Sequence, residues 1–261
     1  MIELCLFTTD IAQARTALAA GIGSLVIDWE NRGKKRRQRG FDTEINRDTP
    51  EDLARLSRLK TARRICRINA WGPTSAAEID LAVRRGATHI LLPMVRSCGE
   101  VELFLNHVDC RCGVGILVET REACSTLAEL ARFPLDLVYV GLNDLAISRG
   151  TRTIFDALVD GTIDRIREAF TDSPLGFAGL TDVRLGDPIP CRLLLAKMVR
   201  LGAAFTFLRR SFKRDLDPAD WADAVARIRL EERRLAARDA AEVDRDEAEL
   251  VAAVRRWGDT T

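Results

Sequence analysis

The sequence lacks the features of a secreted, membrane-spanning or nucleic-acid-binding protein. No apolar run approaches the roughly 20 residues needed to cross a bilayer, so no membrane partner is expected. The first ten residues, MIELCLFTTD, lack the basic start and cleavage site of a signal peptide, which indicates a cytoplasmic protein. The 40 basic residues nearly cancel the 39 acidic ones, which argues against a nucleic-acid partner. The seven cysteines are an odd number without a C-x-x-C pair, as expected for reduced thiols.

What the sequence does contain is a repeated alternation of short apolar runs with segments of helical periodicity. The runs are about strand length and apolar throughout, as expected where helices cover a parallel sheet. They are Leu4–Thr8, Leu25–Trp29, Ile65–Ile68, His89–Met94, Val114–Glu119, Leu137–Gly141, Leu175–Leu180 and Ala204–Leu208. Eight such units predict an α/β fold, a (β/α)8 TIM barrel, with a doubly wound open sheet as the alternative.

The predicted barrel core spans residues 1–215, and residues 216–261 supply the eighth helix and a C-terminal helical extension. No Pro or Gly occurs between Ala219 and Trp257, and apolar residues recur there at helical spacing. This face indicates a contact with a neighbouring subunit, so we expect a homo-oligomer formed through the C-terminal helix. A solvated, partly frayed tail is the other interpretation.

In a barrel, functional side chains gather where the strands end, because the loops there converge on one mouth. Glu119 and Asp144 follow neighbouring strands, and two carboxylates with water and substrate are a typical Mg²⁺ site. Such carboxylates also cap helices or pair with an arginine. Arg67 ends a third strand, where it can stabilise an enolate oxygen or simply neutralise the two acids.

Several segments together resemble the HpcH/HpaI-type aldolase and citrate lyase β-subunit family, over about residues 3–212. The segments are VIDWEN (26–31), CRIN (66–69), GATHILLPMV (86–95), GILVETREA (115–123) and VYVGLNDLAISRG (138–150). The resemblance implies a lyase that cleaves a C–C bond through the enolate of a pyruvate-like α-keto acid, such as pyruvate or oxaloacetate, or of an acyl thioester. The metal would act as a Lewis acid.

The resemblance also assigns roles to residues of this chain. Glu119 and Asp144 would bind Mg²⁺, with Mn²⁺ or Co²⁺ as possible substitutes, and Arg67 would stabilise the enolate. Asp28 and Glu30 match acids that hold metal-bound water, which makes them catalytic candidates beside Arg67. The predicted substrate contacts are Arg67, Asn143, Leu142, Asn31, Arg39 and Arg209.

One departure from the family bears on the acid–base chemistry. Family members that cleave hydroxy-keto acids carry a histidine where this chain has Asn31, and an amide cannot relay a proton. The two histidines, His89 and His107, are expected toward the other end of the barrel. We therefore expect a metal-bound water or a carboxylate as the base. A biosynthetic synthase running the condensing direction and a non-catalytic ligand-binding barrel are the alternatives.

A basic loop follows the second strand and contains Lys34, Lys35, Arg36, Arg37 and Arg39. Arg209 and Arg210 follow the eighth strand, which places the two groups on one side of the mouth. They form either an anion funnel for a small phosphorylated, polycarboxylic or coenzyme-A-linked substrate, or a solvated charge run.

Overall fold

The chain folds into a closed barrel of parallel strands. The structure is a computed structural model, and it describes residues 1–34, 46–59 and 62–259. Each strand pairs with the next and β8 pairs with β1, so the predicted (β/α)8 barrel is confirmed and the open sheet is wrong. The strands are β1 (Glu3–Phe7), β2 (Ser24–Asp28), β3 (Arg63–Arg67), β4 (His89–Leu92), β5 (Gly113–Val118), β6 (Leu137–Val140), β7 (Leu175–Phe177) and β8 (Phe205–Phe207).

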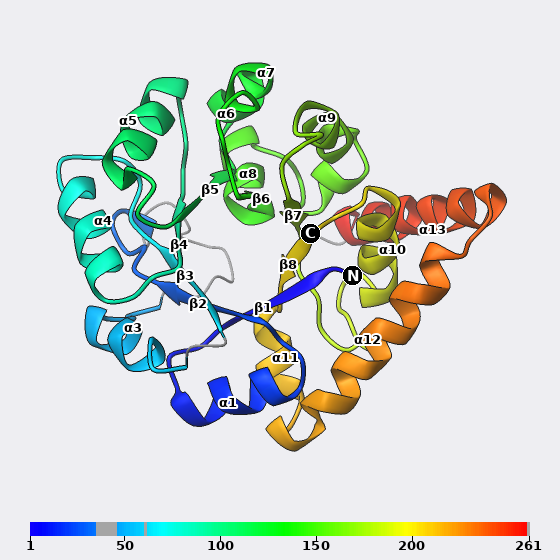
Figure 1. The fold of residues 1–261 in the computed structure, drawn as a ribbon. Helices are drawn as coiled ribbons and strands as arrows, with labels where there is room; N and C mark the ends of the chain where they lie inside the picture. Colours follow the sequence, from blue (N-terminus) through cyan, green and yellow to red (C-terminus); the bar gives the residue numbers. More distant parts are fainter. Residues whose placement is uncertain (35–45, 60–61, 260–261) are drawn as a thin grey trace.

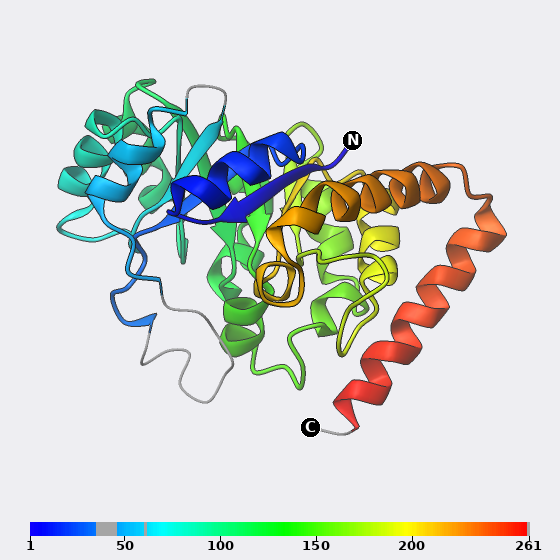
Figure 2. The same cartoon turned by 90° about the horizontal axis from the view of Figure 1, so that it is seen from below.

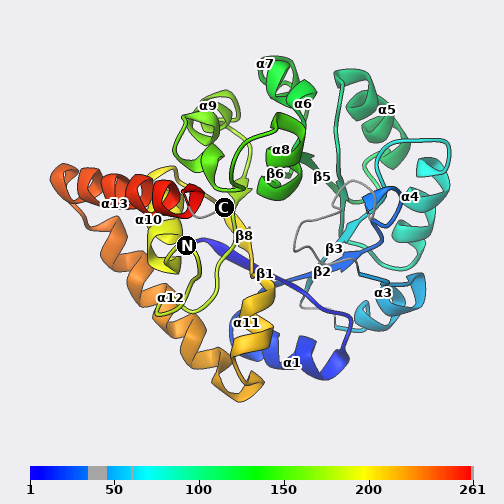
Figure 3. The ribbon, with the colours of Figure 1, turned by 180° about the vertical axis from the view of Figure 1, so that it is seen from behind.

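Helices surround the barrel, as Figures 1 and 3 show from opposite sides. Over the described residues they are α1 (Ile11–Ala19), α3 (Pro50–Leu56), α4 (Ser75–Arg84), α5 (Cys98–Val108), α6 (Arg121–Ser125), α7 (Leu127–Leu130), α8 (Leu142–Arg149), α9 (Thr162–Ala169), α10 (Cys191–Arg200), α11 (Arg210–Asp215), α12 (Trp221–Ala236) and α13 (Ala240–Gly258), with short 3₁₀ turns at Asp156–Leu158 and Pro218–Asp220. None of the helices described has the length and apolar character to cross a bilayer.

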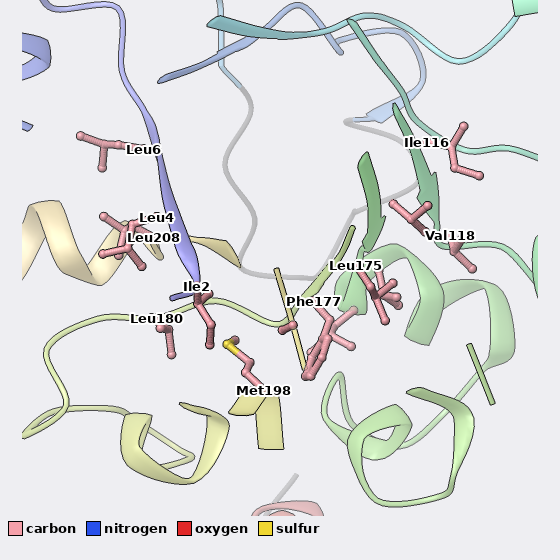
Figure 4. Close-up of a cluster of buried hydrophobic side chains, with 14 of the residues drawn as sticks. Ile2, Leu4, Leu6, Ile116, Val118, Leu175, Phe177, Leu180, Met198 and Leu208 are labelled. Atoms are coloured by element: carbon pink, nitrogen blue, oxygen red, sulfur yellow. The ribbon is translucent and has the colours of Figure 1, made fainter. Parts of the chain in front are cut away.

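The strands are apolar on both faces because each face packs against a separate layer. Successive side chains of a strand point to opposite faces. Val26 and Tyr139 belong to the cluster that fills the barrel interior. Leu4 and Phe177 belong to the larger cluster outside it, together with Met198 of α10, as Figure 4 shows. This double burial explains why the eight runs lack the alternation of a half-exposed sheet.

The C-terminal helix α13 folds back along the outside of the same barrel, as its red ribbon in Figure 2 shows. It packs against α10 and buries Leu250 and Val254. Glu247 of α13 lies 3.0 Å from the buried Lys197 of α10. The apolar face identified in the sequence is therefore covered largely by the chain itself. The contact with a neighbouring subunit stays a prediction.

Candidate active site

A cavity of about 1290 Å³ lies where the loops that follow the strands converge. Six of the residues predicted to form the site line this cavity: Arg67, Glu119, Leu142, Asn143, Asp144 and Arg209. Asp28 and Glu30 are buried beside Arg67 and form the layer behind it. Arg39 lies outside the described residues. The structure therefore gathers most of the predicted site around one cavity.

The position of Glu119 follows from the pairing of β5 with β6. Val118 pairs with Val140, so Glu119 emerges next to Gly141 at the same level of the barrel. A Cβ atom at Gly141 would lie 2.1 Å from Oε2 of Glu119, so only glycine leaves room for this carboxylate. The backbone N–H of Met94 donates a hydrogen bond of 2.9 Å to Oε1 of Glu119. Met94 adopts a left-handed φ of 55°. These contacts fix Glu119 in the cavity wall.

Asp144 lies in the first turn of α8 and is buried, and its charge acts directly on Glu119. Burial, followed by the charges of Asp144 and Glu30, raises the pKa of Glu119 to about 8, although Arg67 opposes the shift. Within residues 1–34, 46–59 and 62–259, no third His, Cys, Asp or Glu joins them in a metal-binding group. Two carboxylates that repel each other fit Mg²⁺, which commonly binds one or two carboxylates and keeps several waters.

Arg67 is held in the cavity wall by an ion pair that the strand register creates. Asp28 and Arg67 are direct partners in the pairing of β2 with β3. Nε and Nη2 of Arg67 donate hydrogen bonds of 2.8 and 2.7 Å to the two oxygens of Asp28. The guanidinium also lies 5.3 Å from the centre of the Phe7 ring. Burial alone would raise the pKa of Asp28, but Arg67 and Lys34 hold it far below its usual value.

Lys34 is a cavity residue that the sequence did not assign to the site. It was grouped with the basic loop, but the structure buries it to 3 % exposure, so it is no solvated charge. Its Nζ lies 3.1 Å from Oδ2 of Asp28 and 3.4 Å from Oε2 of Glu30. Asn46 donates a further bond of 3.1 Å to the same Asp28 oxygen. The only available signal was that Lys34 comes first in its basic run, nearest the end of β2.

The opposite side of the cavity is rich in arginine. Arg152, Arg184, Arg209 and Arg210 line it from the loops after β6, β7 and β8, and we call this set the arginine side. Burial lowers the pKa of Arg209 below its usual value. Trp257, from the last turn of α13, also lines the cavity. The arginine side provides cationic groups suited to an anionic part of a ligand.

Histidine and Asn31 contribute no described side chain to the cavity wall. His89 begins β4 and therefore lies at the far end of its strand, and His107 is on α5, 3.9 Å from Asp80. Asn31 is exposed, and its backbone N–H donates a bond of 3.0 Å to the side chain of Asn69. Neither histidine nor Asn31 is among the residues that line the cavity. Acid–base chemistry in this cavity must therefore use other groups.

The barrel is similar in fold to solved structures that include a citrate lyase, an HpcH/HpaI aldolase and the protein CitE. A citrate lyase from Burkholderia xenovorans LB400 matches with a TM-score of 0.62 at 14% identity, over 98% of this chain and 83% of the other. An HpcH/HpaI aldolase from Desulfitobacterium hafniense DCB-2 matches with a TM-score of 0.58 at 14% identity, over 82% and 89%. The protein CitE from Mycobacterium tuberculosis, in complex with magnesium and pyruvate, matches with a TM-score of 0.57 at 20% identity, over 95% and 97%.

The chain has the barrel fold of these proteins. At such low identity the likeness shows the fold alone, and it agrees with the resemblance that the sequence motifs indicated. No family model and no curated protein matches the sequence.

Proposed function

We propose that this protein is a Mg²⁺-dependent carbon–carbon lyase that acts on a pyruvate-like α-keto acid, or an acyl thioester, through its enolate. The observation that carries the proposal is the joint placement of Glu119, Asp144 and Arg67 on one cavity. Two carboxylates suited to a divalent cation face a guanidinium that is fixed by Asp28. The likeness to CitE in complex with magnesium and pyruvate supports the same assignment.

In this proposal Glu119 and Asp144 hold the metal ion. Bound Mg²⁺ would supply Lewis-acid polarisation of a keto oxygen. Arg67 stabilises the negative charge that develops on the enolate oxygen, since a preorganised cation in a partly buried site acts strongly on such charge. The first N–H groups of α8, at Leu142 and Asn143, lack partners within the helix and suit a substrate carboxylate.

The arginine side would bind the anionic remainder of the substrate. Arg209 and Arg184 present guanidinium groups that suit phosphate or carboxylate. The phosphate groups of a phosphorylated or coenzyme-A-linked substrate would pair with these guanidinium groups. A cavity of about 1290 Å³ is larger than pyruvate alone requires, which favours a substrate with such an extension.

Calorimetric titration with MgCl₂ and oxalate, a mimic of the enolate, tests the site. The wild type should bind oxalate only when Mg²⁺ is present, and Glu119→Gln should weaken binding at least about tenfold. Glu100→Gln is the matched control, because Glu100 of α5 pairs with Arg96 and neither of the two lines the cavity. Binding that Glu119→Gln leaves unchanged would contradict the metal assignment.

Oxaloacetate decarboxylation then separates an enzyme from a binding protein. Turnover that requires Mg²⁺ and falls in Glu119→Gln supports the lyase. Oxalate binding without turnover would support a non-catalytic ligand-binding barrel instead. Product analysis with pyruvate and a set of aldehydes would show whether the enzyme also runs in the condensing direction.

A further inference from the structure

The proposed reaction needs a group that delivers a proton to the enolate carbon, and no histidine lines the described part of the cavity. Arginine keeps its proton at all ordinary pH values, so Arg67 is unsuited to this role. Tyr139 lines the cavity, but its hydroxyl donates to the carbonyl oxygen of Ala178. Burial raises the pKa of Tyr139 far above its usual value. Among the described residues that line the cavity, Lys34 is the lysine, and its ammonium carries exchangeable protons.

We infer that Lys34 is the catalytic acid and base of this site, exchanging a proton between its Nζ and the carbon of the enolate next to the keto group. The inference rests on the proposed function. It follows from the buried position of Lys34 in the cavity wall and from the contacts that hold its ammonium there.

The contacts of Lys34 place it next to the proposed enolate site. Its Nζ and Nη2 of Arg67 share one oxygen, Oδ2 of Asp28, at 3.1 and 2.7 Å. The two cations are therefore neighbours on the same wall. The ammonium donates a hydrogen bond of 3.1 Å to Oδ2 of Asp28 and forms an ion pair with Oε2 of Glu30 at 3.4 Å. These carboxylates hold the ammonium in place while its side chain lines the cavity.

The proton balance of the step is simple. After the C–C bond breaks, its electron pair remains with the keto acid as the enolate. An N–H bond of the Lys34 ammonium breaks, a C–H bond forms at the enolate carbon, and Lys34 is left as a neutral amine that regains a proton from water. In the reverse direction the neutral amine removes a proton from the methyl group of pyruvate. The enzyme should therefore exchange the methyl protons of pyruvate with deuterium in D₂O.

Exchange of pyruvate methyl protons, followed by proton NMR with Mg²⁺ present, tests the inference. Lys34→Arg keeps the charge and the bonds to the acids but cannot donate a proton at ordinary pH, so exchange should fall about 100-fold or more. Oxalate affinity in Lys34→Arg should stay near that of the wild type. In Lys34→Ala, added ethylamine should restore part of the exchange in proportion to its concentration.

Lys197→Arg is the matched control. Lys197 is equally buried and lies 3.0 Å from each of two acids, Asp164 and Glu247, but on α10 outside the barrel. The rate at which Lys197→Arg exchanges the methyl protons of pyruvate should equal that of the wild type.

The outcomes separate this inference from the proposed function. Wild-type exchange that Lys34→Arg retains would overturn the role of Lys34 and leave the lyase proposal standing. A Lys34→Ala variant that is folded, inactive and not restored by ethylamine would also overturn it, since Lys34 would then only position Asp28. A wild type that neither exchanges pyruvate protons nor binds oxalate would overturn the lyase proposal, and the role of Lys34 with it.

Discussion

Asp28, the last residue of β2, and Asp182, in the loop after β7, are both fully buried, and each is held by two cationic side chains. Both also have a pKa below the usual value, which for Asp182 is lowered to about 2 because its arginines outweigh the effect of burial. The cationic partners of the two aspartates differ in where they lie. Lys34 and Arg67, which hold Asp28, both line the cavity.

Of the two partners of Asp182, one belongs to an outer helix and the other lines the cavity. Arg227 reaches Asp182 from the outer helix α12, at 2.5 Å, and ties the loop after β7 to that helix. Arg184 lines the cavity on the arginine side, and its side chain is 64% exposed. An acid at a strand end is therefore weak evidence for chemistry. The surroundings of its cationic partners decide whether it supports a site or the fold.

The largest effect that distinguishes the two aspartates is expected on activity, when Asp28 is substituted. Asp28→Asn removes the charge that holds Lys34 and Arg67, so Mg²⁺-dependent oxaloacetate decarboxylation should fall about 100-fold. Asp182→Asn, the same change at the other aspartate, should leave the rate near that of the wild type. Steady-state rates of the two variants provide the measurement. Equal losses in both would show that the two aspartates do not differ in function.

The next effect is on stability and concerns Arg227. Arg227→Met leaves the buried carboxylate of Asp182 without one of its partners. The free energy of unfolding should therefore fall by about 2 kcal/mol. This value is smaller than that of a fully buried pair because Arg227 is partly exposed. Arg184→Met removes the exposed partner of the same Asp182 and should lower the free energy of unfolding less than Arg227→Met does. Urea titrations measure both. A larger loss of stability in Arg184→Met than in Arg227→Met would show that Arg184, and not Arg227, is the structural partner of Asp182.

A smaller effect is expected from adding one methyl group beside the proposed metal site. In Gly141→Ala the new Cβ would meet Oε2 of Glu119, and the flexible carboxylate would move rather than the strand. Oxalate binding in the presence of Mg²⁺ should weaken about tenfold while the thermal unfolding temperature stays near that of the wild type. Gly99→Ala on α5, where the nearest atom lies 3.9 Å away, is the control. Unchanged binding in Gly141→Ala would show that the position of Glu119 is not critical.

The smallest effect concerns Asp48, whose Oδ2 accepts a bond of 2.8 Å from the backbone N–H of Asp28. Burial is the main cause that raises the pKa of Asp48, from 3.8 to about 6, and the charge of Asp28 adds to it. Between these pH values the folded protein binds more protons than the unfolded chain, so this group makes stability fall as pH rises. Urea titrations at about pH 4.5 and 6.5 give the free energy of unfolding at the two pH values. Asp48→Asn should remove the contribution of this group to the difference between them. A difference that stays the same in Asp48→Asn would contradict the raised pKa of Asp48.

The barrel was predictable because its signal is local. Each strand, such as Leu137–Val140, is a short run that is apolar on both faces, and a helix follows. The barrel end at which Glu119 and Asp144 lie could also be read from the sequence, because Glu119 follows directly on an apolar run and Asp144 comes within the first turn of the helix after the next run. These features depend on neighbouring residues only.

The parts that sequence reasoning missed depend on contacts between distant segments. The direct pairing of Asp28 with Arg67 depends on the register of β2 against β3, which neither run encodes alone. Lys34 looked like a member of a charged loop, and only the fold shows that it turns back toward Asp28. Trp257 joins the cavity because α13 returns along α10, and a helical pattern does not indicate where its helix docks.

The wall provided by Trp257 has a consequence for the order in which the site is built during synthesis. The strand-end residues are all translated before α13, so the cavity lacks that side until the last turn of α13 has been made. A chain whose translation stalls before α13 would carry the acids and Arg67 in an unfinished pocket, open to solvent where Trp257 belongs.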